Sequence, residues 1–304
     1  MQEPAIETYN LRKVFGRKVA VDSLTLTVGQ GEVFGFLGPN GAGKTTAVKM
    51  LTALVRPTAG SARILGRPVG NIEAKRHIGY LPEHFRFHEW LEGGEFLDLH
   101  GRLYGMSREQ RKRRIPIVLS MVGLSHRAGD KLRTYSKGML QRIGLAQAIL
   151  HEPRIVFLDE PTSALDPLGR REVRDMIKQL AACGTTVFLN SHLLSEVELV
   201  CDRVAIIDKG RVVRIGALSN LLSSQTELEI RVGAITSSVL EELGRLGTGV
   251  NLSDSVITMS LNDQETIPLV VDTIVRGGGK IYSLTPRHVS LEDLFVNVVE
   301  EGEA

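Results

Sequence analysis

One segment near the N-terminus combines the residue types needed to hold phosphate groups. It reads Gly38-Pro39-Asn40-Gly41-Ala42-Gly43-Lys44-Thr45 and matches the eight-position phosphate-binding loop pattern without a substitution. Its glycines let successive backbone N–H groups turn toward a polyphosphate, and the helix expected from Thr46 adds the positive end of its dipole. Lys44 is suited to reach the β- and γ-phosphates, and the Thr45 hydroxyl is suited to bind Mg²⁺. The loop therefore predicts a site for a nucleoside polyphosphate and Mg²⁺.

Two adjacent carboxylates, Asp159 and Glu160, end the apolar run at residues 155–158. Because side chains alternate along a strand, the two acids should point in different directions. Asp159 is suited to hold Mg²⁺, directly or through water, and Glu160 is suited to polarise an attacking water as a general base. Strand ends are often acidic, so the run alone is weak evidence. Together with the phosphate-binding loop, it predicts hydrolysis of the nucleotide.

A third segment, Ser136-Lys137-Gly138-Met139, opens a stretch of helical pattern that runs on through Leu150. Ser136 is a candidate N-cap, and the start of this helix would be a second anion-binding position. Taken alone, the segment would be interpreted as a plain capped helix. Two further polar segments follow it, Ser163-Ala164-Leu165-Asp166 and Asn190-Ser191-His192.

The elements that must position these residues alternate between short β-rich runs and helical patterns. This alternation favours an α/β fold around a parallel sheet. The clearest strands are residues 33–37, 155–158 and 186–189. They are almost continuously apolar, as strands covered on both faces must be. Residues 5–10 and 24–28 alternate polar and apolar and predict a half-exposed antiparallel edge, and residues 208–211 predict a hairpin turn in which Gly210 takes a positive φ.

Helical patterns dominate about residues 84–150. Ser107 and Gln110 form a predicted capping box at the start of one helix, and Pro116 inside that helix predicts a kink or a restart. A further helix is predicted from Pro167 to Cys183, with Gly184 just past its end. We therefore expect a nucleotide-binding domain at 1–218 with a helical subdomain at about 84–150. Residues 219–304 predict a small α+β domain with two or three strands and two or three helices.

Composition limits the possible partners and location. The chain has 304 residues, is 42% hydrophobic and carries a formal charge of only +2, so we expect no general binding of nucleic acid. The basic cluster at 111–114 is interpreted as a solvated helix face, with nucleic-acid binding as the alternative. Cys183 and Cys201 form no disulfide or zinc pattern and are predicted to be buried. The N-terminus has no signal-peptide pattern, and no apolar run approaches the roughly 20 residues of a membrane span, so we expect a cytoplasmic chain that reaches a membrane only through a partner.

The five segments occur in an order that resembles the nucleotide-binding subunit of ATP-binding-cassette (ABC) transporters, over about residues 5–218. The resemblance implies that Gly38 to Thr46 is Walker A, that Asp159 is the Walker B aspartate and that Glu160 is the catalytic base. It implies that Ser136 to Met139 is the signature motif, which contacts the γ-phosphate of ATP held by a second subunit. Residues 163–166, ending at Asp166, would be the D-loop that couples the two sites. His192 would be the switch histidine on the γ-phosphate.

Phe15 matches the position that stacks on adenine in this family, although a lone phenylalanine is more often part of the core. Two departures from the family pattern are visible. Glu83 stands in the segment that usually holds a Mg²⁺-contacting glutamine, and a carboxylate cannot donate a hydrogen bond as an amide does. Lys137 and Met139 replace the commonest glycine and glutamine of the signature. Both variants, and residues 285–295, resemble the bacterial branch of drug, sodium and haem-maturation exporters.

The resemblance implies a function for the whole chain. Two copies, or one copy and a homologous cassette, would bind ATP and Mg²⁺ head to tail and hydrolyse the ATP. This would drive a separate integral membrane permease, in the direction of export, from the cytoplasmic face of the membrane. Trp90, Leu91 and Phe96 are candidates for the permease contact, and burial in the subunit's own core is the alternative. The competing functions are a soluble ATPase acting on nucleic acid or ribosomes and a regulatory module that binds nucleotide without hydrolysis.

Overall fold

The computed structural model describes residues 3–84, 87–222, 226–261, 263–288 and 290–301. Contacts divide the chain into two compact units, an N-terminal unit at residues 1–216 and a C-terminal unit at 217–304. The boundary predicted from the sequence, between residues 218 and 219, lies two residues further along the chain. Among the described residues, no helix is both long and apolar enough to cross a membrane.

The centre of the N-terminal unit is a six-stranded sheet with the order β10-β9-β3-β8-β7-β6. Its strands are β3 (Val33–Leu37), β6 (Ile78–Leu81), β7 (Ile155–Asp159), β8 (Thr186–Asn190), β9 (Arg203–Asp208) and β10 (Arg211–Ala217). From β9 to β6 the strands run parallel, and every residue of β3, β7 and β8 is buried. The turn between β9 and β10 places Lys209 at φ 46° and Gly210 at φ 82°. The predicted parallel core and the predicted hairpin are both confirmed.

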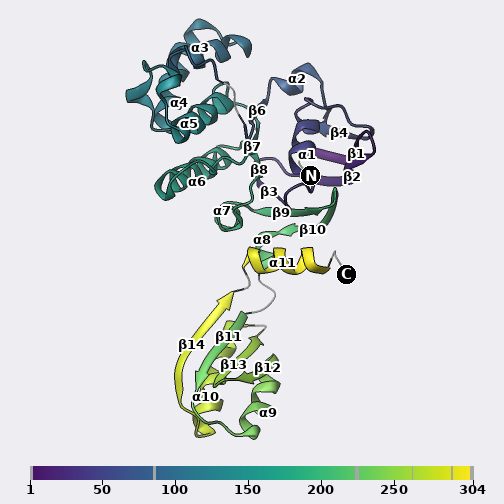
Figure 1. The fold of residues 1–304 in the computed structure, drawn as a ribbon, viewed down its shortest axis with the longest axis vertical. Helices are drawn as coiled ribbons and strands as arrows, with labels where there is room; N and C mark the ends of the chain where they lie inside the picture. The colour runs from purple at the N-terminus through teal and green to yellow at the C-terminus, as the bar shows by residue number, and fades with distance from the viewer. Residues whose placement is uncertain (1–2, 85–86, 223–225, 262, 289, 302–304) are drawn as a thin grey trace. The chain divides into compact units, whose positions relative to one another are not determined.

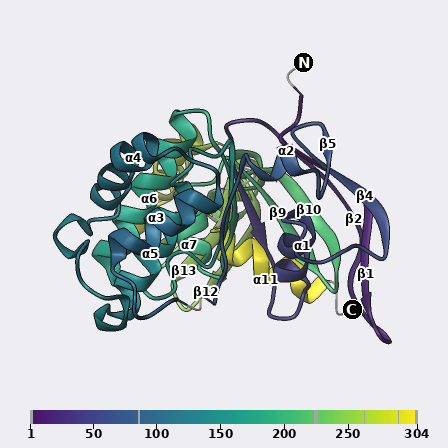
Figure 2. The ribbon, with the colours of Figure 1, turned by 90° about the horizontal axis from the view of Figure 1, so that it is seen from above.

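A layer of phenylalanine rings fixes the central strands to one another. The Phe188 ring lies at the middle, with its centroid 5.6 Å from that of Phe34, 5.3 Å from that of Phe36 and 5.3 Å from that of Phe157. Helix α1 (Lys44–Leu51) contributes buried side chains to the same core. Figure 2 shows α1 on one side of the central strands and helices α3 to α6 on the other.

The predicted antiparallel edge is a separate four-stranded sheet with the order β2-β1-β4-β5. Its strands are β1 (Ile6–Phe15), β2 (Lys18–Val28), β4 (Ala59–Ile64) and β5 (Arg67–Pro68), and the short helix α2 (Ile72–Lys75) follows them. Strands β1 and β2 are longer than predicted because register shifts between Thr8 and Val14 interrupt the alternation of buried and exposed residues. The turn between them places Phe15 and Lys18 beside the phosphate-binding loop.

The predicted helical region forms a group of three helices, visible at the upper left of Figure 1. They are α3 (Gly93–Leu103), α4 (Arg108–Met121) and α5 (Lys137–Ile149), with short 3₁₀ turns at Ser125–Arg127 and Leu132–Thr134. The capping box is confirmed, because Gln110 N–H donates to Ser107 Oγ at 3.2 Å and Ser107 N–H donates to Gln110 Oε1 at 2.7 Å. Helix α4 runs through Pro116 as one element, so the predicted restart is wrong. The buried residues Val118 and Leu119, just past the proline, hold the second half of α4 against the core.

The prediction of a solvated basic face holds for only half of the cluster. Lys112 and Arg113 are exposed. The guanidinium of Arg111 lies 2.6 Å from Asp98 Oδ1, and that of Arg114 donates to the carbonyl oxygens of Ile149 and Leu150 at 3.3 Å. These two arginines join α4 to α3 and α5, which a helical pattern in the sequence cannot reveal.

Helix α6 (Pro167–Ala182) is confirmed within one residue, and α7 (Leu194–Glu198) precedes Cys201. The prediction that both cysteines are buried is right for Cys201 and wrong for Cys183. Cys183 is the C-cap of α6, where the chain turns out of the helix and leaves the thiol exposed. Cys201 lies against the buried strand β3, and burial raises the pKa of its thiol.

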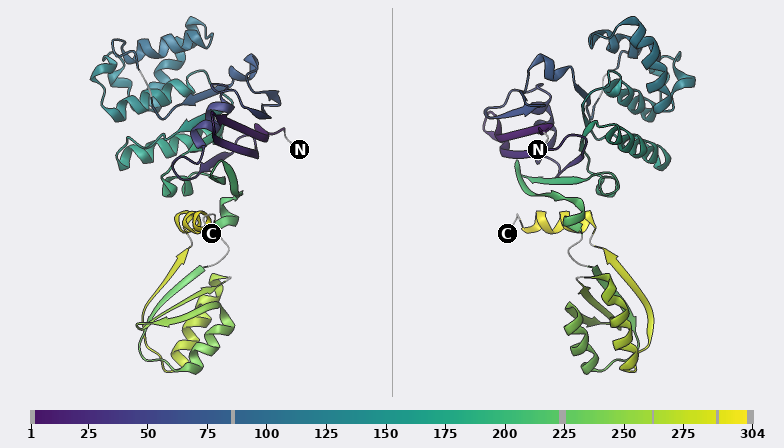
Figure 3. Two further views of the ribbon diagram at one scale, coloured as in Figure 1. Left: turned by 45° about the vertical axis from the view of Figure 1, so that its right-hand side comes forward. Right: turned by 180° about the vertical axis from the view of Figure 1, so that it is seen from behind.

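The C-terminal unit is a four-stranded antiparallel sheet with the order β12-β13-β11-β14. Its elements are α8 (Leu218–Leu222), β11 (Thr226–Val232), α9 (Ser237–Leu246), β12 (Thr248–Ser253), β13 (Val256–Leu261), a 3₁₀ turn (Gln264–Thr266), α10 (Ile267–Arg276), β14 (Ile281–His288) and α11 (Leu291–Glu301). From β11 to β14 this is the βαββαβ order of ferredoxin-like units, and α9 and α10 cover one face of the sheet (Figure 3). The predicted count of two or three strands is therefore wrong. Residue 289, within the predicted family-like tail, lies outside the described residues.

We expect Phe188→Ala to lower the free energy of unfolding by about 3–5 kcal/mol, because it leaves a cavity amid three other buried rings. Urea unfolding followed by circular dichroism measures this loss. Phe15→Ala is the matched control, because its ring is 49% exposed and its loss should cost well under about 1 kcal/mol. Equal losses for the two variants would contradict the assignment of Phe188 to the centre of the core.

Candidate active site

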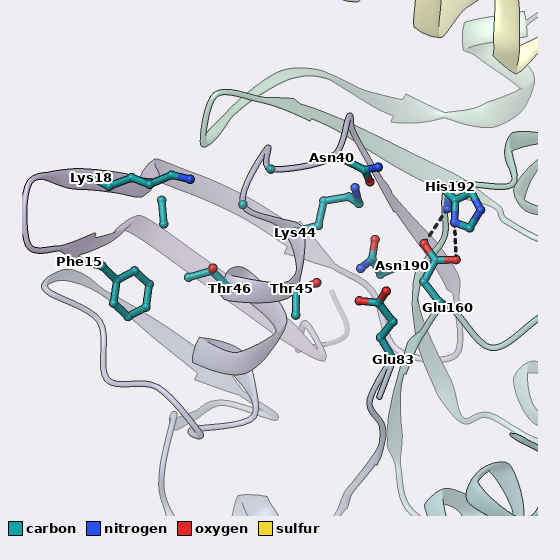
Figure 4. A pocket seen from close by; sticks show the side chains of 13 residues that line it. Phe15, Lys18, Asn40, Lys44, Thr45, Thr46, Glu83, Glu160, Asn190 and His192 are labelled. Atoms are coloured by element: carbon teal, nitrogen blue, oxygen red, sulfur yellow. Dashed lines mark hydrogen bonds and ion pairs between the residues drawn. The ribbon is translucent and has the colours of Figure 1, made fainter. Parts of the chain in front are cut away.

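A cavity of about 500 Å³ opens at the carboxyl ends of the central strands, where α1 begins (Figure 4). It is lined by Phe15, Lys18, Ala20, Asn40, Gly41, Gly43, Lys44, Thr45, Thr46, Glu83, Glu160, Asn190 and His192. Most of the residues predicted for the nucleotide site therefore meet in one place, although they come from segments far apart in the chain. Gly38, Pro39 and Ala42 belong to the loop but do not line the cavity.

The loop needs glycine at two positions for steric reasons. A Cβ on Gly38 would lie 2.2 Å from the carbonyl oxygen of Ile207, and a Cβ on Gly43 would lie 2.2 Å from that of Ala20. Gly43 also has φ 105°, which side chains other than hydrogen rarely allow. The loop therefore packs against two neighbouring strands while its backbone stays open toward the cavity.

Lys44 is buried at the first position of α1. Its Nζ donates hydrogen bonds to the carbonyl oxygens of Gly38 at 2.7 Å and Pro39 at 3.2 Å. Burial lowers the pKa of Lys44, and the carboxylates of Glu160, Asp159 and Glu83 act in the opposite direction. The ammonium group is thus held at the edge of the loop, where it faces the cavity.

Asp159 is fully buried at the end of β7. Its Oδ1 accepts a hydrogen bond from Nδ2 of Asn190, whereas Oδ2 has no partner among the described residues. Burial, joined by the nearby charges of Glu83 and Glu160, raises the pKa of Asp159 to about 6, while the Asn190 hydrogen bond and Lys44 oppose the shift. At neutral pH the site therefore contains a buried negative charge that is only partly compensated.

Glu160 lies just past the end of β7 and lines the cavity, whereas Asp159 does not line it. Its Oε1 accepts the backbone N–H of His192 at 2.9 Å, and its Oε2 lies 2.7 Å from His192 Nδ1. The backbone of Glu160 has φ 55°, a strained value for a non-glycine residue. Its carbonyl oxygen is held by Gln141 Nε2 at 3.1 Å and by the Ser163 hydroxyl at 3.2 Å. These contacts hold the backbone of Glu160 in this strained conformation.

The oxygen atoms at this end of the cavity fit a Mg²⁺ ion. The Thr45 hydroxyl and the Glu83 carboxylate line the cavity, and the unpartnered Oδ2 of Asp159 lies buried beside them. Hydroxyl and carboxylate oxygens are the ligands that Mg²⁺ prefers. A divalent cation would also compensate the charge that burial makes unfavourable at Asp159.

The predicted signature segment lies elsewhere on the N-terminal unit. Ser136 caps α5, because its Oγ accepts the N–H of Met139 at 3.3 Å. A second cavity of about 400 Å³ is lined by Gly123, Leu124, His126, Arg127, Ser136, Gly138, Met139, Arg142, Ala164, Leu165 and Asp166. No described residue lines both cavities. Lys137 is exposed, and Asp166 Oδ1 accepts the N–H of Gly169 at 2.9 Å as the N-cap of α6.

Sequence reasoning missed Lys18 and Ala20 of the first cavity, and it named the segment that contains Asn190 without giving Asn190 a role in the site. Asn190 had a usable signal, because it is polar at the end of a buried strand, and its partner in the sheet register is Asp159. Lys18 had only its closeness to Phe15 across the turn from β1 to β2. Among the candidates for the permease contact, Phe96 is buried and Trp90 is 67% exposed, so the core alternative is correct for Phe96.

Comparison with known proteins decides the family. A sequence model described as "ABC transporter" matches residues 21–163. An uncharacterized ABC transporter ATP-binding protein of Synechocystis is 39% identical over 310 residues, which covers 99% of this chain and 86% of that protein. The chain belongs to the ABC transporter family. It is an ATP-binding subunit of that family, its reaction is ATP hydrolysis, and its cofactors are ATP and Mg²⁺.

Two other similar proteins bear on how this ABC subunit works. The linearmycin resistance ATP-binding protein LnrL of Bacillus subtilis is 32% identical, over 96% of this chain and 97% of its own length. A dimeric ATP-binding cassette in a post-hydrolysis state, bound to ADP and phosphate, has a TM-score of 0.65 and 26% identity, over 70% of this chain and 98% of that cassette. The α/β cassette fold predicted from the sequence is confirmed by this likeness.

We expect Asp159→Asn to stabilise the nucleotide-free ABC subunit at pH 7 and above. The pKa of Asp159 is raised from 3.8 to about 6, so the parent loses stability as the pH rises from about 4 to 6 and the buried group ionises. The amide variant avoids this loss. Its advantage should grow across the same interval to at most about 3 kcal/mol and then level off.

Thermal unfolding between pH 4 and 8 measures this difference. Asp175→Asn is the matched control, because Asp175 lies exposed on α6 and its replacement should change the melting temperature little at any pH. An advantage of Asp159→Asn that is constant across the pH range, or that is absent at pH 7, would contradict the buried-charge account.

Proposed function

We propose that two copies of this subunit bind MgATP between them, head to tail, and that hydrolysis drives export through a separate membrane permease. The observation that carries this proposal is the division of the phosphate-binding groups between two cavities. One cavity contains the loop with Lys44, and the other contains the start of α5 at Ser136. A second copy that faces the first would place the loop cavity of each copy opposite the helix-start cavity of the other. Two composite sites would form in this way.

The chemistry of the two cavities makes them complementary toward a triphosphate. The loop offers backbone N–H groups and the Lys44 ammonium to the phosphate chain. The helix start at Ser136 offers the positive end of its dipole to phosphate oxygens that the loop leaves uncovered. Arg127 and Arg142 line the same cavity, where they are ion-paired with Asp130 and Glu172. The dimeric cassette bound to ADP and phosphate, which this chain resembles, supports the same arrangement here.

The residues at and beside the first cavity divide the work of hydrolysis between them. Glu160 accepts the proton of the attacking water at a carboxylate oxygen. One of its oxygens must first be released from His192, whose side chain is 56% exposed and therefore free to turn toward the γ-phosphate. The Lys13 ammonium lies over one face of the Phe15 ring, 4.8 Å from its centroid, so adenine would stack on the opposite face. Thr45, Glu83 and Asp159 would hold Mg²⁺, which neutralises phosphate charge when it is bound.

Coupling to a permease follows from the difference between ATP and its products. The γ-phosphate contacts both copies, so ATP stabilises the closed dimer relative to the separated subunits. Hydrolysis removes these contacts and with them the preference for the closed dimer. Trp90 is 67% exposed and lies in the chain between Glu83 and α3, and we propose that it contacts a permease helix. LnrL is named for linearmycin resistance, which supports export. The subunit would then be bound peripherally at the cytoplasmic face of the membrane.

We expect Glu160→Gln to bind ATP with parent-like affinity but to hydrolyse it about 10²–10⁴ times more slowly, because the amide cannot accept the proton of water. Phosphate release and binding of a fluorescent ATP analogue measure the two properties. Glu242→Gln, at an exposed position of α9, is the matched control and should keep the parent rate. Parent-like hydrolysis by Glu160→Gln would rule out its role as the base.

A mixing experiment tests the head-to-tail arrangement. Lys44→Ala disables the loop and Ser136→Arg blocks the helix start, so each variant alone should be inactive. In a head-to-tail heterodimer the two defects fall in the same site and leave the other site intact. An equal mixture should therefore recover activity, up to about a quarter of the parent rate, because about half of the dimers are mixed. No recovery on mixing, although both variants bind each other, would contradict a site shared between copies.

A further inference from the structure

Three buried polar atoms at the ends of neighbouring strands have no hydrogen-bond partner among the described residues: Tyr80 Oη on β6, Asp159 Oδ2 on β7 and Asn190 Oδ1 on β8. The sheet register places Tyr80 opposite Phe157, two residues before Asp159, and places Asp159 opposite Asn190. Side chains two residues apart on a strand share a face. All three atoms therefore project from the sheet face that α1 covers.

The protonation state of Tyr80 is fixed by its surroundings. Its ring packs against the core, and its hydroxyl oxygen is buried. Burial raises the pKa of Tyr80, and the nearby charges of Asp159 and Glu83 raise it further. At neutral pH the phenol keeps its proton, so Tyr80 is a hydrogen-bond donor close to the carboxylates of Asp159 and Glu83.

The donors and acceptors of this cluster do not balance without a further group. Because a carboxylate only accepts, Asn190 must turn Nδ2 toward Asp159 Oδ1, which leaves the amide oxygen facing away. Two acceptors, Asp159 Oδ2 and Asn190 Oδ1, and one donor, the Tyr80 hydroxyl, remain. One water molecule supplies two donors and an acceptor, which matches these three groups in kind. Leaving all three buried groups without a partner costs more free energy than immobilising one water.

We propose that Tyr80 is a positioning residue for the Mg²⁺ site: its hydroxyl donates to an ordered water that in turn donates to Asp159 Oδ2 and Asn190 Oδ1. The proposal rests on the proposed role of Asp159 as a Mg²⁺ ligand. The water fixes the orientation of the carboxylate, and each carboxylate oxygen keeps a second lone pair for the metal or for a water bound to it. Tyr80 thereby acts on the metal through Asp159 and does not touch the reacting phosphate.

Tyr80→Phe removes only the hydroxyl and is tested in the Glu160→Gln background, where turnover is blocked. Electron paramagnetic resonance of free Mn²⁺, added to protein with saturating ATP, measures metal affinity. We expect about tenfold weaker Mn²⁺ binding, in the range typical for loss of a group that orients a metal ligand. ATP affinity in EDTA should stay at the parent value, and the melting temperature should not fall, because the removed hydroxyl has no protein partner.

Tyr104→Phe is the matched control. The Tyr104 hydroxyl bonds to Gln147 and its ring stacks on His151, 3.6 Å away between centroids. We expect this variant to lose melting temperature and to keep Mn²⁺ affinity, which is the opposite pattern. An equal fall of Mn²⁺ affinity and of metal-free ATP affinity in Tyr80→Phe would overturn the proposal, because it would indicate general distortion.

Asp159→Asn in the same background distinguishes a failure of the Tyr80 role from a failure of the Asp159 metal site. If it weakens Mn²⁺ binding while Tyr80→Phe stays within about twofold of the parent, the role of Tyr80 is wrong and the metal site stands. If Asp159→Asn also binds Mn²⁺ like the parent, the proposed metal role of Asp159 is wrong, and the role of Tyr80 is wrong with it.

Discussion

Two adjacent carboxylates buried beneath the phosphate-binding loop are the constraint on which the rest of the N-terminal unit depends. Asp159 is fully buried and Glu160 nearly so, and each requires compensation inside the protein. Asn190 and His192, from the end of β8 and the turn after it, supply hydrogen bonds to one carboxylate each. Lys44 supplies positive charge from the start of α1. The compensation is incomplete in the free subunit, and a bound Mg²⁺ would complete it.

The fold produces this arrangement through the direction of its strands. Parallel strands end at the same edge of a sheet, so residues following β3, β7 and β8 meet there although they are distant in sequence. The phenylalanine layer centred on Phe188 fixes these strands to each other just before they end. The rigid core thus stops where the charged site begins, and the strain at Glu160 is borne by contacts to Gln141 and Ser163.

The sequence predicted what local patterns encode. Apolar runs gave the buried strands, the capping box at Ser107 gave a helix start, and the glycine-rich loop gave the phosphate cradle. What it missed depends on partners distant along the chain. Arg111 is ion-paired with Asp98 on another helix, and Asn190 joins the site through the register with Asp159. The C-terminal sheet has four strands where two or three were predicted, and β12 in particular is largely exposed and shows no alternation that would mark it as a strand.

The central proposal is that two copies share MgATP head to tail, with the γ-phosphate contacting the loop of one copy and the helix start at Ser136 of the other. Light scattering on Glu160→Gln tests this directly, because the variant hydrolyses ATP slowly enough for the ATP-bound state to persist during the measurement. We predict a dimer in MgATP and a monomer in MgADP at the same protein concentration. A monomer in both, under conditions where ATP is shown to be bound, would contradict it.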